Sequence, residues 1–439
     1  MRASKEDNAE SRGSGKTRGG AIESDAGTFG TVLFLEQYYY PEGWGGAQLP
    51  RDVTVDWARA GYRVAVVCGS EQYARSEEQD MEDPRSAGVV IRRIPALVKG
   101  DVRRRKVLRQ AWFLLAVLPA MVAGARPDVL VTQTNPPVAV LLTAVISRLR
   151  RRPYVIIAQD LYPEVIFAHG MLSRHTLLGK LLTVVFARAY GGAAAVVSLG
   201  PRMTSRLVEK GVTAERVWQI PNWATGDLRV IRGAANELRR SWNLEGKFVV
   251  LYSGNLGVAH DCETLLRAVA ISSDRIAHLR LVFIGGGTRS EEARKLVHEL
   301  KLERIVLFKP FVPFALLPQT YGLADLSVVT LLPGFDGLVV PSKLLGNMAR
   351  GVPTLYIGPP ASDVDIWLQE SGGGVSIANG DADAAAECLT MCVRDAGRLE
   401  EFGAAARRFY DDRLRRELAL DQYRHMLSRT LAGDGPKEA

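Results

Sequence analysis

Residues 248–261 read FVVLYSGNLGVAHD, a strand pattern followed by a turn that contains glycine. The apolar run up to Ser253 is continuous rather than alternating, which favours a parallel strand covered on both faces. Gly254 and Gly257 follow the strand, and a helical pattern begins at Asp261. In open parallel sheets such turns let a phosphate approach backbone amides at the carboxyl end of a strand. A glycine-rich turn can equally serve tight packing alone, so both readings stay open for this turn.

The same order of strand, turn and helix recurs on both sides of this stretch. Strands about 30 residues apart with helices between them indicate βαβ units and therefore an α/β fold with parallel sheets. We expect strands over 31–39, 64–68, 89–94, 128–133, 154–158, 194–199, 217–220, 248–253, 279–284, 305–308, 326–331 and 354–357. We expect helices over 47–60, 138–150, 177–190, 202–210, 261–270, 291–300, 316–323 and 343–350, and one more between strands 89–94 and 128–133.

The rhythm breaks over residues 223–246, which are rich in asparagine and glycine and weak in apolar side chains. This segment predicts a linker between two doubly wound halves, 28–222 and 247–398. Residues 399–431 predict two charged amphipathic helices within a last segment, 399–439. Residues 1–27 have only Met1 and Ile22 as large apolar side chains, which predicts a disordered tail without a secretory signal.

Two further glycine turns follow strand patterns. Residues 41–47 read PEGWGGA after the first strand, and residues 285–287 are three glycines after strand 279–284. Because such turns occur in both halves, we expect a ligand-binding cleft between two domains. A nicotinamide dehydrogenase is disfavoured, because no GxGxxG is followed by an acidic residue about 20 positions on. The sequence also lacks the GxSxG and HExxH motifs of serine hydrolases and zinc enzymes.

The 439 residues carry 56 Lys and Arg against 48 Asp and Glu, a net charge of +8. A mildly basic chain suits nucleic acid, an anionic membrane or an anionic substrate. Basic clusters at 99–109 and 148–152 flank the apolar runs 111–125 and 138–146, which favours contact with an anionic membrane through 99–152. Core helices with solvated basic ends explain the pattern equally well. No nucleic-acid-binding motif or interleaving of aromatic and basic residues is present, so nucleic acid is not expected as a partner.

The four cysteines are too few and too scattered for a disulfide framework and fit a reducing compartment. Cys388 and Cys392 could share a helix face, but no histidine pair accompanies them. Packing is the better explanation of this spacing, and we predict no metal site.

Several of these stretches together resemble the family 4 glycosyltransferases of the GT-B fold. The resemblance lies in 251–257 with His260, 283–287, 321–325, 337–343 with 351–353, and, in the first half, Gly45, Gly46 and the DLYPE run 160–164. It spans about residues 30–425 and is closest to the branch that builds bacterial exopolysaccharide and O-antigen. The resemblance implies two Rossmann-like domains facing across a cleft. The C-terminal half would bind a UDP- or GDP-sugar, the N-terminal half would bind the acceptor, and the final helix would return to the N-terminal half.

The resemblance also implies transfer with retention and without a bound metal, so cations and backbone amides must stabilise the leaving diphosphate. Lys343 begins a helix, where a cation and the helix terminus coincide, and could take this role; a solvated lysine at a helix start is the alternative. Asp160 could bind an acceptor or sugar hydroxyl, or it is a turn aspartate. The expected catalytic residues are Asp160 and Lys343, the donor-binding residues Gly254, Asn255, Gly257, His260, Gly285, Gly286, Asp336, Ser342 and Lys343, and the acceptor or diphosphate loop Gly45 and Gly46.

The chain departs from the commonest family pattern, in which two glutamates with seven residues between them precede the Gly-x-Pro turn. Leu338 and Gly346 stand in their places, and Asp336 is the nearest acid. An arginine and a lysine around the first donor loop are replaced by Asn255 and His260. His260 could supply the missing cation or simply cap its helix.

The expected function is therefore a retaining hexosyltransferase that uses no cofactor. It moves a sugar from a nucleotide-sugar to a polyprenyl-linked acceptor in cell-surface polysaccharide biosynthesis. The expected location is cytoplasmic and peripheral, at the inner face of the cytoplasmic membrane. Two alternatives stay open: a GT-B nucleotide-sugar epimerase, and a non-catalytic relative that binds nucleotide-sugars, which the absent glutamates motivate.

Overall fold

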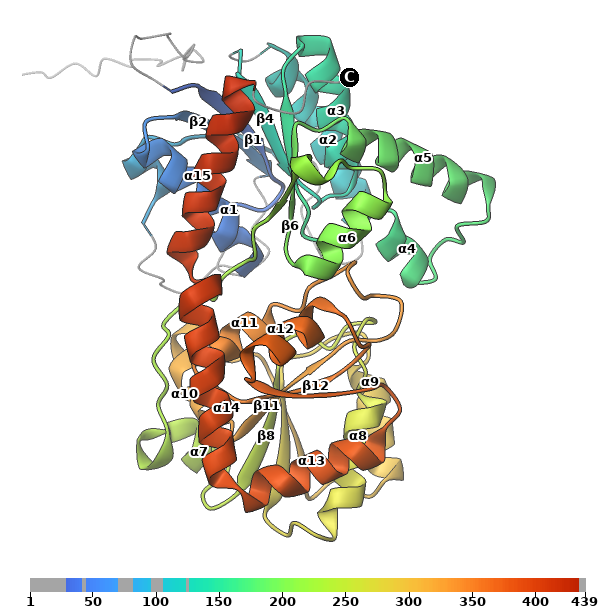
Figure 1. Cartoon of the computed structure of the whole chain (residues 1–439), viewed down its shortest axis with the longest axis vertical. Helices are drawn as coiled ribbons and strands as arrows, with labels where there is room; N and C mark the ends of the chain where they lie inside the picture. Colours follow the sequence, from blue (N-terminus) through green and yellow to red (C-terminus); the bar gives the residue numbers. More distant parts are fainter. Residues whose placement is uncertain (1–28, 42–44, 70–81, 96–105, 124–125, 434–439) are drawn as a thin grey trace, which may run out of the picture.

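The computed structural model of the chain describes residues 29–41, 45–69, 82–95, 106–123 and 126–433. Figure 1 shows two halves placed end to end, each a twisted sheet with helices around it. The predicted tail 1–27 and the basic residues 99–105 lie outside the described residues.

The first half contains a seven-stranded sheet in which all registered pairs are parallel. Its order is β3-β2-β1-β4-β5-β6-β7, the order of a doubly wound sheet. The strands are β1 (Thr31–Leu35), β2 (Arg63–Gly69), β3 (Val90–Ile94), β4 (Val129–Gln133), β5 (Tyr154–Ile157), β6 (Ala195–Ser198) and β7 (Val217–Gln219). The helices are α1 (Gly45–Arg59), α2 (Lys106–Ala123), α3 (Val138–Arg150), α4 (Glu164–Ala168), α5 (Leu177–Gly191) and α6 (Pro201–Glu209).

The second half repeats the plan with a six-stranded parallel sheet of order β10-β9-β8-β11-β12-β13. Its strands are β8 (Phe248–Ser253), β9 (Leu279–Ile284), β10 (Val306–Lys309), β11 (Leu326–Thr330), β12 (Thr354–Ile357) and β13 (Gly374–Ile377). The remaining helices are α7 (Glu237–Ser241), α8 (Glu263–Ser273), α9 (Ser290–Glu299), α10 (Leu317–Leu323), α11 (Lys343–Met348), α12 (Asp363–Ser371), α13 (Ala382–Arg394), α14 (Ala396–Phe409) and α15 (Arg416–Ala432). The predicted α/β class with two Rossmann-like parallel sheets is confirmed.

Continuous apolar strands build the core, as the sequence pattern indicates. Every residue of β4 and β5 is buried, and helices α2, α3 and α5 cover one face of the first sheet. The other face is covered by α1 and, from the far end of the chain, by α15, whose Tyr423 and Met426 are buried against Trp57 and its neighbours. Cys388 and Cys392 are buried in the core of the second half.

The chain crosses between the halves twice, and both crossings meet at α1. A π-helical turn, Tyr410–Leu414, joins α14 to α15, and Figure 1 shows these helices as one long rod along both halves. Asp52 of α1 accepts a hydrogen bond from Trp223 Nε1 at 3.2 Å on the first crossing and forms an ion pair with Arg416 at 3.0 Å on the second. Ala224 N donates to Tyr410 Oη at 3.2 Å, so the two crossings also bind each other.

Two regions differ from the predicted elements. Residues 358–395, for which we predicted no element, form α12, β13 and α13; β13 is a half-buried edge strand without the apolar run of the central strands. The expected linker contains the short helix α7. The buried Asn236 caps the start of this helix, and its side-chain amide also donates to Ile231 O and Gln319 O. Among the helices described, none combines the length and apolarity that crossing a bilayer requires.

Candidate functional site

Two glycine turns of the second half are joined by backbone hydrogen bonds. Gly254 N donates to Ile284 O and Leu256 N donates to Gly286 O, each at 2.8 Å. Gly287 has φ +154°, and a Cβ there would lie 2.1 Å from Leu256 O, so this approach requires glycine. The turns after β8 and β9 therefore form one surface at the carboxyl edge of the sheet.

The joined turns leave part of their backbone unpaired. The N–H groups of Gly254 and Leu256 already donate the hydrogen bonds that join the two turns. Within the part of the chain that the structure describes, the amides of Asn255 and Gly257 have no hydrogen-bond partner. Within residues 254–257, Asn255 and Gly257 are thus the two whose amides remain free to bind an anion.

Lys343 lies beside these turns as the first residue of α11. Its Nζ donates to Asn255 O at 3.3 Å and lies 4.7 Å from the centroid of the Tyr252 ring. Tyr252 Oη donates to the same carbonyl at 3.0 Å, so one oxygen holds the lysine and the ring together. A Cβ on Gly254 would lie 2.9 Å from Lys343 Cε, which means that glycine makes room for the lysine.

Burial lowers the pKa of Lys343 to about 8. The side chain is therefore cationic at neutral pH but only partly solvated. A poorly solvated cation beside free amides gains more from meeting an anion than a surface lysine does, because less water has to be displaced.

His260 contributes a neutral acceptor rather than a second cation. Its Nδ1 lies 2.8 Å from Thr330 O, and because a carbonyl only accepts, Nδ1 carries the proton and Nε2 keeps a lone pair. Burial, and next the charge of Lys343, lower its pKa to about 4. The helix that follows begins at Glu263 with Cys262 at its N-cap position, so His260 does not cap it either.

Arg289 is a cation that the sequence interpretation missed. Its guanidinium donates to His260 O at 2.5 Å, and its amide donates to Leu256 O at 3.1 Å. Glu292 forms an ion pair with the guanidinium and raises its pKa. Arg289 therefore ties the second glycine turn to the first, a contact that only the pairing of β8 with β9 creates.

Asp336 pairs with the other half. Its carboxylate accepts from Arg206 Nη2 at 2.8 Å and lies 3.5 Å from Arg202 Nε, both on α6. The acid nearest to the absent glutamates is thus part of the contact between the halves. Asp363 strengthens this contact, because its Oδ1 accepts from the amides of Arg202 at 2.8 Å and Met203 at 3.3 Å at the start of α6.

The absent glutamates have a structural reason. Leu338 is buried with the core of the first half, and its carbonyl accepts from Leu161 N at 2.9 Å. A Cβ on Gly346 would lie 2.1 Å from Tyr321 Oη, and Arg350 stacks over the Tyr321 ring at 4.1 Å. A glutamate at 346 would collide with this stack.

Asp160 lies at the other side of the same loop. It forms an antiparallel bridge with Val339, four residues before Lys343, and its amide donates to Thr134 Oγ1 at 3.1 Å. The structure thus brings the loops that carry Asp160 and Lys343 together. Ser342 is exposed at the N-cap position of α11 without a side-chain cap bond.

The remaining predicted residues lie at the start of a helix or directly after a strand. Gly45 and Gly46 are the first two residues of α1, and Gly285 follows β9 with its amide bound to Lys309 O at 2.9 Å. Among the described residues, no group of three or more His, Cys, Asp or Glu side chains could hold a metal ion.

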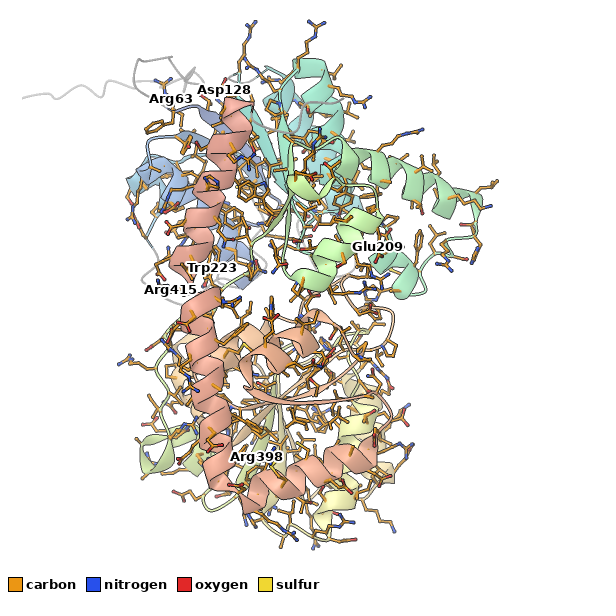
Figure 2. The ribbon with its side chains drawn as sticks, in the orientation of Figure 1. Arg63, Asp128, Glu209, Trp223, Arg398 and Arg415 are labelled. Carbon is orange, nitrogen blue, oxygen red and sulfur yellow. The ribbon has the colours of Figure 1, made fainter. Side chains whose placement is uncertain are left out.

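A cavity of about 910 Å³ lies where the chain crosses between the halves, lined among others by Trp223, Tyr410 and Arg415. Figure 2 shows Trp223 and Arg415 at this crossing. None of the predicted site residues lines it, so it is separate from the joined glycine turns.

Two Rossmann-like domains, bridged by a C-terminal helix and with loops in contact at their facing edges, define the GT-B class of glycosyltransferases. The chain belongs to the family 4 glycosyltransferases of the GT-B fold, which its sequence resembles. A model of the glycosyl transferase 4-like domain matches residues 45–223, and a model of group 1 glycosyl transferases matches residues 235–409.

Curated relatives carry related names. WbjE of Pseudomonas aeruginosa, named as a probable glycosyltransferase, is 26% identical over 68% of this chain and 74% of its own length. WcaI of Escherichia coli, whose name proposes it as a colanic acid biosynthesis glycosyl transferase, is 26% identical over 52% of this chain and 55% of its own length.

Solved structures share the fold. Anabaena HepE in complex with UDP and glucose superposes with a TM-score of 0.68 at 18% identity, covering 91% of this chain and 99% of that one. WaaG, a glycosyltransferase involved in lipopolysaccharide biosynthesis, gives a TM-score of 0.63 at 17% identity over 92% and 100%.

Proposed function

We propose that this chain is a retaining, metal-independent hexosyltransferase of cell-surface polysaccharide biosynthesis. It takes a sugar from a UDP- or GDP-sugar and passes it to a polyprenyl-linked acceptor. The observation that carries the proposal is the partly buried Lys343 cation beside the free amides of Asn255 and Gly257. The name of WcaI supports the polysaccharide setting, the name of WbjE supports glycosyl transfer, and the UDP bound to HepE supports the donor class.

In this proposal the second half holds the leaving group. Negative charge develops on the diphosphate as the bond to the sugar carbon breaks, and cations and aligned amides stabilise that charge without moving. Lys343 supplies the charge and Asn255 and Gly257 supply amides. Nε2 of His260 accepts a hydrogen bond from a hydroxyl group of the nucleotide-sugar.

The first half holds the acceptor. Asp160 lies on the loop that pairs with Val339, so a carboxylate from this half is close to the loop that ends at Lys343. We assign it to an acceptor or sugar hydroxyl. Gly45 and Gly46 are the first two residues of α1, and the amides at the N-terminus of a helix can bind a phosphate.

We further propose that the protein acts at the inner face of the cytoplasmic membrane and contacts it peripherally through 99–152. Arg148, Arg151 and Arg152, at the end of α3, are exposed, as a membrane contact requires. Residues 99–105 lie outside the described part of the chain.

A donor panel tests the proposal. The full chain is incubated with UDP- and GDP-sugars and a lipid extract of the native cell, and the mass of extended lipid is recorded. Transfer from one donor supports the proposal. An isomerised sugar nucleotide formed from the donor alone would identify an epimerase. Thermal stabilisation by UDP or GDP without turnover of any donor would identify a non-catalytic relative that binds nucleotide-sugars.

A further inference from the structure

Large apolar side chains are exposed in the loop after α4 and along the first half of α5. Single exposed apolar residues are ordinary, but a contiguous group usually marks an interaction surface. We call this group the α5 ridge, which consists of Met171, Leu177, Leu178, Leu181 and Val184, with exposed fractions of 78%, 88%, 54%, 58% and 45%. Figure 1 shows α5 projecting from the side of the first half.

Helix geometry gathers the α5 ridge on one side. Leu177, Leu181 and Val184 follow at spacings of four and three residues, so they line one stripe of α5. The second half of the same helix is different, because Phe186 and Tyr190 are buried in the core. Only the projecting end of α5 has apolar side chains with nothing over them in the described chain.

The loop before α5 is held in place. Thr176 Oγ1 caps the helix by accepting from Gly179 N at 3.0 Å, and a Cβ on Gly179 would lie 2.3 Å from Ser173 O, so loop and helix pack closely. At the base of α4, the buried Lys210 forms an ion pair with Glu164 and donates to Tyr162 O at 3.2 Å. The segments on both sides of the α5 ridge are therefore held in place by hydrogen bonds, an ion pair and close packing.

The charge around the α5 ridge selects the occupant. Between Glu164 and Glu209 the sequence has no acidic residue, and the exposed Arg174, Lys180 and Arg188 flank the apolar stripe. An apolar face rimmed by cations is complementary to an anionic bilayer, whose headgroups meet the cations while the apolar side chains enter the acyl boundary. A second copy of the same surface would oppose like charges.

Helix α3, next to α5, also has exposed apolar side chains beside exposed arginines. α3 contacts α5, and its Val145 and Leu149 are exposed by 56% and 74%. The exposed Arg148, Arg151 and Arg152 follow at its end.

We propose that the α5 ridge inserts into an anionic bilayer and docks the first half there. The connection that carries the ridge starts at Asp160, so docking would hold the acceptor side of the site next to the membrane. That second point rests on the proposed lipid-linked acceptor, whereas bilayer insertion does not.

The test measures binding of the full chain to vesicles of 30% phosphatidylglycerol in phosphatidylcholine, by flotation over a range of lipid concentrations. The double variant Leu177→Ser with Leu181→Ser should lose at least about tenfold in affinity, because two leucines no longer leave water. Lys180→Glu should lose about fivefold or more. Val208→Ser, at a residue of α6 exposed by 42% outside the ridge, is the matched control and should bind as the unaltered chain does.

Unchanged vesicle binding by the double variant would overturn the inference. So would a dimer of the unaltered chain, found by light scattering without lipid, that the same double variant dissociates. Thermal stabilisation by UDP and GDP is recorded for each variant. If nucleotides stabilise no variant while the ridge still binds vesicles, the proposed transferase function fails and the docking surface stands.

Discussion

The sharpest prediction concerns Lys343→Met, which removes a charge while keeping an unbranched apolar chain of similar length. The lysine lies on the Tyr252 ring and against the Gly254 turn, and methionine fits that space. The fold should therefore survive, while the site loses its only described cation in contact with the carbonyl of Asn255.

The expected loss of turnover is about 10²- to 10³-fold, the usual effect of removing one donor from a site that stabilises developing negative charge. Loss of one charge-assisted hydrogen bond should also weaken UDP or GDP binding by about 1.5–3 kcal/mol. Lys295→Met, at an exposed lysine of α9 in the same half, is the matched control and should leave both quantities unchanged.

The same substitution should raise the stability of the unliganded protein. Because the pKa of Lys343 falls from 10.5 to about 8 on folding, the unfolded chain binds the proton more tightly. The folded state therefore carries a penalty that is complete below pH 8 and disappears as pH rises from 8 to 10.5. At about 1.4 kcal/mol per pH unit the penalty is at most about 3.5 kcal/mol, and solvent around the side chain reduces it to about 1–2 kcal/mol.

Two measurements check this prediction. The kcat/KM of the unaltered chain should fall as pH rises through about 8, and that of Lys343→Met should not. The melting temperature of Lys343→Met should exceed that of the unaltered chain at pH 7, and the difference should shrink toward pH 10. Near-normal turnover, or a lower melting temperature at pH 7, would refute the assigned role and environment of Lys343.

Three other predictions follow from single contacts. His260 should stay neutral down to about pH 4, with stability lost as pH falls from 6.5 to 4; NMR titration of the six histidines, with His260→Asn for assignment, checks this, and a midpoint near 6.5 would contradict it. Gly346→Ala should lower the free energy of unfolding by about 1–3 kcal/mol because its Cβ meets Tyr321 Oη; Gly397→Ala, whose Cβ would make only an ordinary contact with Asp395 Oδ1 at 3.5 Å, should not, and equal denaturation midpoints would contradict this. Asp363→Ala should remove the cap on α6 and lower that free energy by about 1 kcal/mol, which urea denaturation measures; no change would show that the contact between the halves does not depend on it.

The architecture follows closely from the apolar pattern. Strands β8, β9 and β12 and helix α3 have the predicted bounds, because each is a continuous apolar run or a clear helical period with turn residues at its ends. The first strand ends at Leu35 rather than at residue 39, since the buried Tyr38 and Tyr39 pack in the core without joining the sheet. The half-buried β13 has no apolar run that could predict it.

The site is less accessible from sequence because its contacts join distant segments. Asp336 is predictable as the acid nearest to the absent glutamates, but its pairing with Arg206, 130 residues away, depends on how the halves meet. Tyr252, beneath Lys343, reads in the sequence only as a strand residue. The neutral state of His260 comes from burial and from the nearby charge of Lys343, 83 residues away in the sequence, which no spacing predicts.

One measurement tests the central claim most directly: the anomeric configuration of the product formed from a labelled nucleotide-sugar by the full chain, its native lipid extract and a metal chelator. The account predicts a new lipid-linked glycoside whose NMR anomeric coupling matches that of the donor, formed at least about a hundredfold more slowly by Lys343→Met. An inverted product, transfer that the chelator abolishes, or equal rates for the two proteins would contradict it.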